Sequence, residues 1–149
     1  MQADRDAPAY GTGEIDIAAD PETVWGVVAD IQGGPSRNPD SGVILRGPVR
    51  PGTTFSWRSG AGTITPTFQV VDQPTELAWT GRTMGIPAVH VYRLPPSEQP
   101  PGHTIVATEE SRGGLLARLL RKRFTTTLRT AIDAGLTRLE AEAERRVSP

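Results

Sequence analysis

The sequence predicts an α+β protein in which an antiparallel sheet is covered by one long C-terminal helix. Three observations predict it. The 149 residues suit a single domain. Short runs of alternating polar and apolar residues are separated by many of the 16 glycines and 14 prolines, which indicates strands joined by turns. The stretch from Leu115 to about Arg146 contains no proline and repeats apolar residues at helical spacing.

The N-terminal part of the chain is expected to hold an arm, a strand, a helix and a helical turn or loop, over residues 1–12, 13–18, 21–31 and 35–42. The helix start is marked by Asp20 and Pro21. An Asp side chain accepts hydrogen bonds from free N–H groups, and proline loses no bond at the first helical position. Apolar residues at helical spacing then continue through Ile31.

Six further strands are predicted, over 43–46, 53–59, 63–72, 76–83, 88–94 and 103–111. Pro66 lies inside the third of them, which places that strand at an edge or a bulge. Sequential strands with short connections pair antiparallel. The final helix carries one apolar stripe, formed by Leu116, Leu120, Phe124, Leu128, Ile132, Leu136, Leu139 and Ala143. Only this helix is large enough to cover the apolar face of the sheet, and a strongly curved sheet around it leaves room for an internal cavity.

Composition excludes several classes of function. The chain has no cysteine, which rules out disulfides, cysteine-based zinc sites and a thiol nucleophile. Its 16 Lys and Arg nearly balance 17 Asp and Glu, which argues against nucleic acid as a partner. No apolar run is long enough to cross a bilayer, and the start lacks the apolar region of a secretory signal, so we expect a cytoplasmic protein. Phosphate-loop, dinucleotide and nucleophile-elbow motifs are missing.

Several segments together resemble the START-like, or SRPBCC, superfamily, which includes polyketide cyclase/dehydrase and birch-allergen-like proteins. They are Asp20-Pro-Glu-Thr-Val-Trp25, Pro74-Thr-Glu-Leu-Ala-Trp-Thr-Gly81, His90-Val-Tyr92, Gly102-His-Thr-Ile-Val106 and Glu109-Glu-Ser-Arg-Gly113. The resemblance implies a helix-grip fold: a curved antiparallel sheet of about six to seven strands around a long C-terminal helix, with one or two short helices after the first strand. The domain would span 13–146, with 147–149 as a tail. Arg37 stands where many relatives carry a tryptophan, near the expected pocket mouth.

The resemblance implies that the protein binds a hydrophobic small molecule in an internal cavity. It would act either as a cofactor-free polyketide cyclase/dehydratase-like enzyme of bacterial-type secondary metabolism or as a non-catalytic lipid or small-ligand carrier or sensor. A co-chaperone-like, partner-binding domain is the weaker alternative. We expect no cofactor, no metal and no stable membrane insertion, and the oligomeric state is left open.

The candidate catalytic residues are His90, Tyr92 and Glu110. Alternation puts His90 and Tyr92 on the face that the resemblance turns inward, where an imidazole would serve as acid or base near neutral pH. Alternation alone leaves open whether Glu109 or Glu110 points inward; we favour Glu110, whose structural alternative is a salt bridge to Arg112 or Arg118. The expected ligand-binding residues, each of which has core packing or surface exposure as its alternative, are Arg37, Phe55, Trp57, Phe68, Trp79, Phe124 and Leu128.

Two other features are expected to be structural. His103, the second of two histidines, lies at a strand start and has no recognisable set of metal ligands near it. A basic cluster at the start of the long helix, Arg118, Arg121, Lys122 and Arg123, is most simply a solvated face, with contact to acidic lipid or to a carrier protein's phosphate as the alternative.

Overall fold

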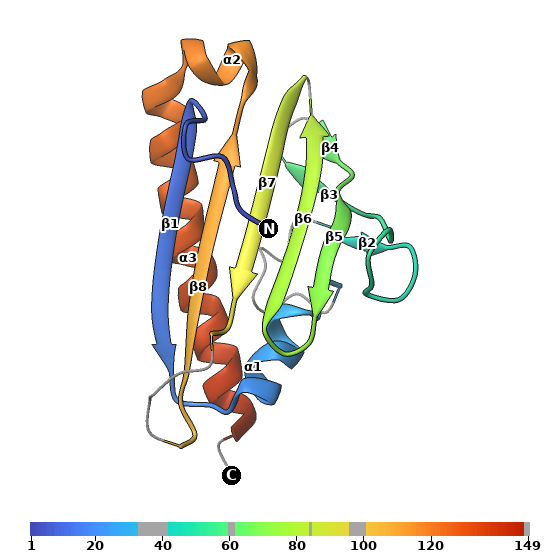
Figure 1. The fold of residues 1–149 in the computed structure, drawn as a ribbon, viewed down its shortest axis with the longest axis vertical. Coiled ribbons are helices and arrows are strands. Elements are labelled where there is room, and N and C mark those ends of the chain that lie inside the picture. Colours follow the sequence, from blue (N-terminus) through green and yellow to red (C-terminus); the bar gives the residue numbers. More distant parts are fainter. Residues whose placement is uncertain (33–41, 60–61, 84, 96–100, 148–149) are drawn as a thin grey trace.

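The computed structural model describes residues 1–32, 42–59, 62–83, 85–95 and 101–147, and Figure 1 shows its sheets and helices. A five-stranded sheet has the order β1-β8-β7-β6-β5, and a three-stranded sheet has the order β2-β3-β4. The elements are β1 (Ala9–Ile17), α1 (Pro21–Val28), β2 (Ile44–Leu45), β3 (Phe55–Ser59), β4 (Gly62–Ile64), β5 (Thr67–Asp72), β6 (Glu76–Thr83), β7 (Ile86–Arg93), β8 (Thr104–Arg112), α2 (Gly114–Leu119) and α3 (Arg121–Val147). Neighbouring strands pair antiparallel throughout, and α3 lies along β1 and β8. The predicted α+β class is therefore confirmed.

The first strand is longer than predicted. It begins at Ala9 rather than at residue 13, so the arm ends at residue 8. Its first three inward positions are Ala9, Gly11 and Gly13, which are too small to stand out as apolar residues alternating with polar ones. A Cβ on Gly13 would lie 2.7 Å from both Ile132 and Leu136 of α3, which shows how closely the helix approaches this strand. Small residues at β1 are what permit that approach.

Helix α1 starts as predicted and ends early. The Asp20 carboxylate accepts a hydrogen bond from the Thr23 N–H at 2.7 Å, and Pro21 occupies the first turn. The helix ends at Val28, three residues before the predicted end at Ile31, which is nevertheless buried. Most of the turn or loop expected over 35–42 lies outside the described residues.

The strand predicted over 63–72 is two strands. β4 and β5 belong to different sheets and are separated at Pro66, whose carbonyl accepts a hydrogen bond from the Phe55 N–H at 3.1 Å. That bond and an isolated bridge between Thr54 and Thr67 connect the two sheets. The register shift lies further on, between Phe68 and Val70. Proline cannot donate to a ladder, so the chain changes sheet where the donor is missing.

The long C-terminal helix is also divided. It breaks at Leu120 (φ −112°, ψ 35°), so that α2 contacts β7 at one end of the sheet and α3 runs back along the sheet (Figure 1). The predicted stripe is buried in α3, where it consists of Leu128, Ile132, Leu136, Leu139 and Ala143. Its first two members, Leu116 and Leu120, are exposed, contrary to the prediction. They precede the segment that packs on the sheet.

Candidate functional site

The inner face of the five-stranded sheet aligns one residue from each of four strands. Glu110 of β8 lies opposite His90 of β7, His90 lies opposite Trp79 of β6, and Trp79 lies opposite Phe68 of β5. Because side chains alternate between faces, these four paired residues project to the same side of the sheet. Glu110 is paired with Gly11 of β1, and a Cβ added to Gly11 would contact side chains of α3. This side of the sheet is therefore the one that faces the helix.

Aromatic rings form the apolar part of this face. Phe55 of β3 lies 4.7 Å from Phe68, 5.4 Å from Trp79 and 5.6 Å from Trp57, measured between ring centroids. The three rings of Phe55, Phe68 and Trp79 are buried, and Trp57 is half-buried. The register and the link between the two sheets thus bring together four of the predicted ligand-binding aromatics, which come from the three strands β3, β5 and β6.

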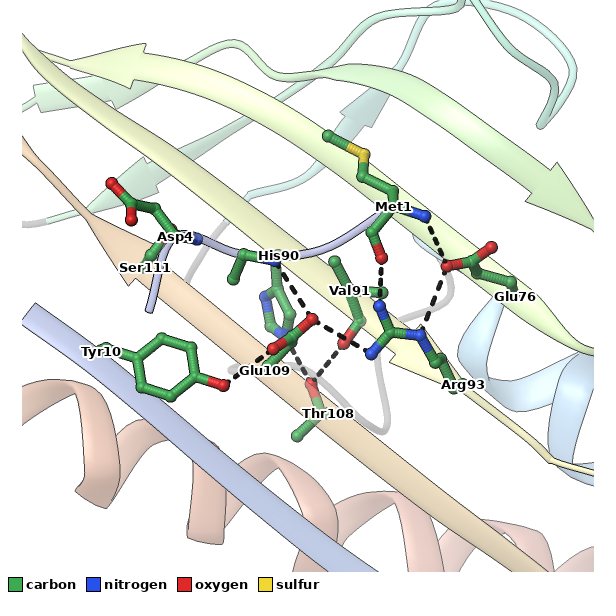
Figure 2. Close-up of polar contacts among 11 residues, drawn as sticks. Met1, Asp4, Tyr10, Glu76, His90, Val91, Arg93, Thr108, Glu109 and Ser111 are labelled. Atoms are coloured by element: carbon green, nitrogen blue, oxygen red, sulfur yellow. Dashed lines mark hydrogen bonds and ion pairs between the residues drawn. The ribbon is translucent and has the colours of Figure 1, made fainter. Parts of the chain in front are cut away.

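His90 connects the aromatic rings to the polar groups. Its ring lies 4.8 Å from Trp79 and stacks on Tyr92 at 4.6 Å with an interplanar angle of 24°. Its Nε2 lies 3.0 Å from the Thr108 hydroxyl, whose own proton is donated to the Val91 carbonyl at 2.9 Å (Figure 2). The Thr108 oxygen is therefore the acceptor, and Nε2 carries a proton.

The other imidazole nitrogen faces Glu110. Nδ1 of His90 lies 3.7 Å from Oε2 of Glu110, and the two side chains are 15% and 11% exposed. Oε1 of Glu110 lies 3.2 Å from Nη2 of Arg112, so the salt bridge considered from the sequence exists alongside the histidine contact. The Arg112 Nε is buried and has no hydrogen-bond partner among the described residues. A buried N–H without a partner is costly, so this donor is available to an oxygen from a ligand or a water molecule.

A small pocket joins these groups. It has a volume of about 20 Å³ and is lined by Trp57, Ile64, Pro66, Trp79, Gly81, Ala88, His90, Glu110 and Arg112. That volume holds about one water molecule. In this conformation the pocket is therefore too small for a hydrophobic small molecule, and Trp57 and Trp79 form part of its wall.

Glu109 lies on the opposite, outer face, which resolves the choice that alternation left open. Its carboxylate accepts hydrogen bonds from the Tyr10 hydroxyl at 2.8 Å and the Ala3 N–H at 3.1 Å, and it lies 3.1 Å from the Arg93 guanidinium (Figure 2). Burial raises the pKa of Glu109, but these donors outweigh burial and leave the pKa below its ordinary value. Glu109 therefore holds the N-terminal arm to the sheet.

Three predicted site residues are not part of this constellation. Leu128 is buried between α3 and β1, where a Cβ on Gly11 would lie 3.6 Å from it. Phe124 is partly buried against the core. Arg37 lies outside the described residues.

His103 is 3.1 Å from Asp16, away from His90. No group of three or more potential metal ligands occurs in the part of the chain that the structure describes.

Arg112 and Thr108 were not singled out as site residues. Side chains alternate between the two faces of a strand, so residues 108, 110 and 112 lie on one face of β8. An inward-facing Glu110 therefore implies from the sequence alone that Thr108 and Arg112 also face inward. What the sequence lacked was the register between β7 and β8, which brings His90 within reach of both.

Comparison with known proteins agrees with this architecture. Residues 11–144 match the model of the family described as polyketide cyclase / dehydrase and lipid transport. The chain belongs to this family. No protein with a curated description matches its sequence significantly. None of the helices in the described residues is long and apolar enough to span a membrane.

Several solved structures share the fold. A hypothetical protein from Helicobacter pylori is 16% identical, with a TM-score of 0.79, and the match covers 93% of this chain and 90% of that one. The Zhui aromatase/cyclase from a Streptomyces species is 17% identical, with a TM-score of 0.73 and coverage of 93% and 95%. Norcoclaurine synthase from Thalictrum flavum, in complex with dopamine and hydroxybenzaldehyde, is 12% identical, with a TM-score of 0.67 and coverage of 94% and 88%. At these identities the likeness is one of fold alone.

Proposed function

We propose that the protein binds a hydrophobic small molecule at the inner face of its sheet and catalyses cofactor-independent ring closure or dehydration there. The observation that carries this proposal is the His90–Glu110 pair, with Nδ1 and Oε2 3.7 Å apart in a pocket walled by Trp57 and Trp79. Two titratable groups against an apolar wall are the components that acid–base catalysis needs. Family membership supports the same class of reaction.

The pair exchanges one proton with the ligand. Because Nε2 of His90 donates to the Thr108 oxygen, the Nδ1 lone pair is the base, and the Glu110 carboxylate beside it stabilises the imidazolium that forms. The imidazolium is then the acid that returns the proton. Arg112 contributes the free Nε–H donor, which is suited to a carbonyl oxygen that becomes an oxyanion.

In the proposed reaction, an enolate forms at the pocket and closes the ring. His90 removes a proton from the carbon beside a ligand carbonyl, and the oxyanion of the resulting enolate is held by Arg112. The enolate carbon attacks a second carbonyl and forms the ring, and the new alkoxide regains the proton from the pair. Loss of a further proton and of the hydroxyl as water completes a dehydration. Tyr92, stacked on His90, remains the alternative proton donor.

A ligand larger than water must part the side chains around the pocket. Trp57 is the half-buried member of the aromatic cluster and lies on β3, in the smaller sheet. Displacing Trp57 would open the space between the two sheets. It would leave intact the pairing of β6 with β7 and of β7 with β8, which positions His90 and Glu110. Ligand binding would then select an opened conformation of the protein.

The test compares the two histidines. Purified protein is incubated with aromatic and linear β-diketones as probe substrates, and products are identified by mass spectrometry. His90→Ala and Glu110→Gln are expected to lower turnover by about 10²-fold or more, whereas His103→Ala, on the exposed strand start, should leave it unchanged. Equal turnover in all four proteins would overturn the catalytic assignment.

A carrier function is the second candidate, and the mostly apolar pocket lining favours it. Trp57, Ile64, Pro66 and Ala88 supply wall but no chemistry. A carrier would bind an apolar fluorescent probe, would be stabilised against heat by it, and would form no product. Probe binding that survives His90→Ala, together with unchanged probe substrates in the wild type, would identify the protein as a carrier.

A further inference from the structure

The corner between α2 and α3 exposes an unusual amount of apolar surface. Leu115 and Leu119 are each 71% exposed, and Leu116 and Leu120 are 40% and 42% exposed. They make up four of the seven exposed large hydrophobic residues in the described part of the chain, and they lie within six consecutive positions. Clustered exposed leucines, unlike scattered ones, indicate a surface that meets another apolar body.

The same corner is strongly cationic. Residues 111–132 contain six Arg and Lys and no Asp or Glu, in a chain whose net charge is −1. Four of the six surround the leucines: Arg118, Arg121, Lys122 and Arg123 are exposed, and none of them forms an ion pair with a carboxylate of the described residues. We call these four cations and Leu115, Leu116, Leu119 and Leu120 the α2 corner.

The α2 corner lies at one end of the molecule (Figure 1). The break at Leu120 turns the chain there, and the Gly113 N–H donates to the Pro87 carbonyl at 2.9 Å, which ties the start of α2 to β7. Pro87 is followed by Ala88, which lines the pocket and is paired with Arg112 of β8. The corner and the pocket therefore lie at the same end of the sheet.

We propose that the α2 corner docks on the surface of an anionic lipid bilayer, with its leucines inserted among the acyl chains and its cations at the headgroups. Interleaved leucines and cations match a medium that is negative at its surface and apolar just below it. The chain turns through a helix break, so the leucines protrude as a tip rather than forming the flat stripe of a helix–helix interface. An acidic protein partner and a second copy of this chain are the competing occupants.

Docking at this end would place the pocket next to the bilayer, where an apolar ligand could pass between them. Ligand transfer between pocket and bilayer rests on the proposed ligand-binding function, but docking on the bilayer does not. Docking and ligand binding can be tested separately, because vesicle binding is measured without any ligand and because His90→Ala should bind vesicles as the wild type does.

The experiment is sedimentation of the full chain with vesicles of phosphatidylcholine alone and of phosphatidylcholine mixed with phosphatidylglycerol. We expect binding to the anionic vesicles only, weakened by salt. Leu115→Ser/Leu119→Ser and Arg121→Glu/Lys122→Glu should each reduce binding about tenfold or more. Both pairs are exposed, so the variants should fold, which circular dichroism checks. The matched controls are Ile44→Ser, 54% exposed on β2, and Arg138→Glu, exposed later in α3; both should bind normally.

Three results would overturn the proposal. Wild-type binding that is absent, or equal for neutral and anionic vesicles, would contradict docking on an anionic surface. Unchanged binding by the leucine variant would place the contact elsewhere. Self-association that requires Leu115 and Leu119, without vesicle binding, would assign the corner to a second copy of the chain.

Discussion

Glu109 and Glu110 are sequence neighbours with different surroundings. Strand alternation sends Glu109 to the outer face, where Tyr10, Ala3 and Arg93 satisfy it, and Glu110 to the inner face, beside His90 and Arg112. A buried carboxylate surrounded by fixed donors stabilises the fold, whereas Glu110 lies beside an imidazole and lines a small pocket. The two residues show how one strand serves both structure and chemistry.

We predict that Glu109→Gln lowers the free energy of unfolding by about 2 kcal/mol at pH 7. Glu14→Gln, on the exposed face of β1, should change it little and serves as the control. Because folding lowers the pKa of Glu109 below 4.5, its stabilisation is complete above that pH and is lost as the pH falls through the folded pKa. Urea unfolding at pH 7 and near pH 3 should therefore show the difference between the wild type and Glu109→Gln shrinking in acid. A difference that is the same at both pH values would contradict this role.

At the scale of elements, the contact between β1 and α3 depends on glycine. A Cβ at Gly13 would lie 2.7 Å from Ile132 and Leu136, whereas a Cβ at Gly135, within α3, would meet nothing within 4 Å. Gly13→Ala should therefore destabilise the protein by about 1–3 kcal/mol through overpacking. Gly135→Ala should stabilise it by about 1 kcal/mol, because alanine is the better helix former. Chemical denaturation of both variants tests the pair, and the same sign for both would show that α3 does not pack as described.

The elements also show what sequence could and could not predict. Strand β6 was predicted with its observed bounds and the Asp20 cap with its observed role, because both follow from local chemistry. The start of β1 was missed because its buried positions are Ala and Gly, and the break at Leu120 was missed because no glycine or proline marks it. The row from Glu110 to Phe68 requires strand register, which no single segment specifies.

For the whole molecule, the two sheets and the α2 corner define three working parts. The five-stranded sheet positions His90, Glu110 and Arg112, and the smaller sheet adds Phe55 and Trp57 as an apolar wall. The α2 corner lies at the pocket end of the sheet and is the surface that we propose for docking. We propose that the inner face between the two sheets accepts an apolar ligand.

Ligand binding at this face can be followed by NMR at a single residue, because the chain contains only two histidines. The imidazole signals of His90 and His103 are followed while an aromatic β-diketone is added, with His90→Ala used to assign them. We predict that the His90 signals shift in a saturable way and that those of His103 do not, since His103 lies beside Asp16 at an exposed strand start. Binding of the same probe, detected by calorimetry, with no change at His90 would show that the ligand does not bind at this face.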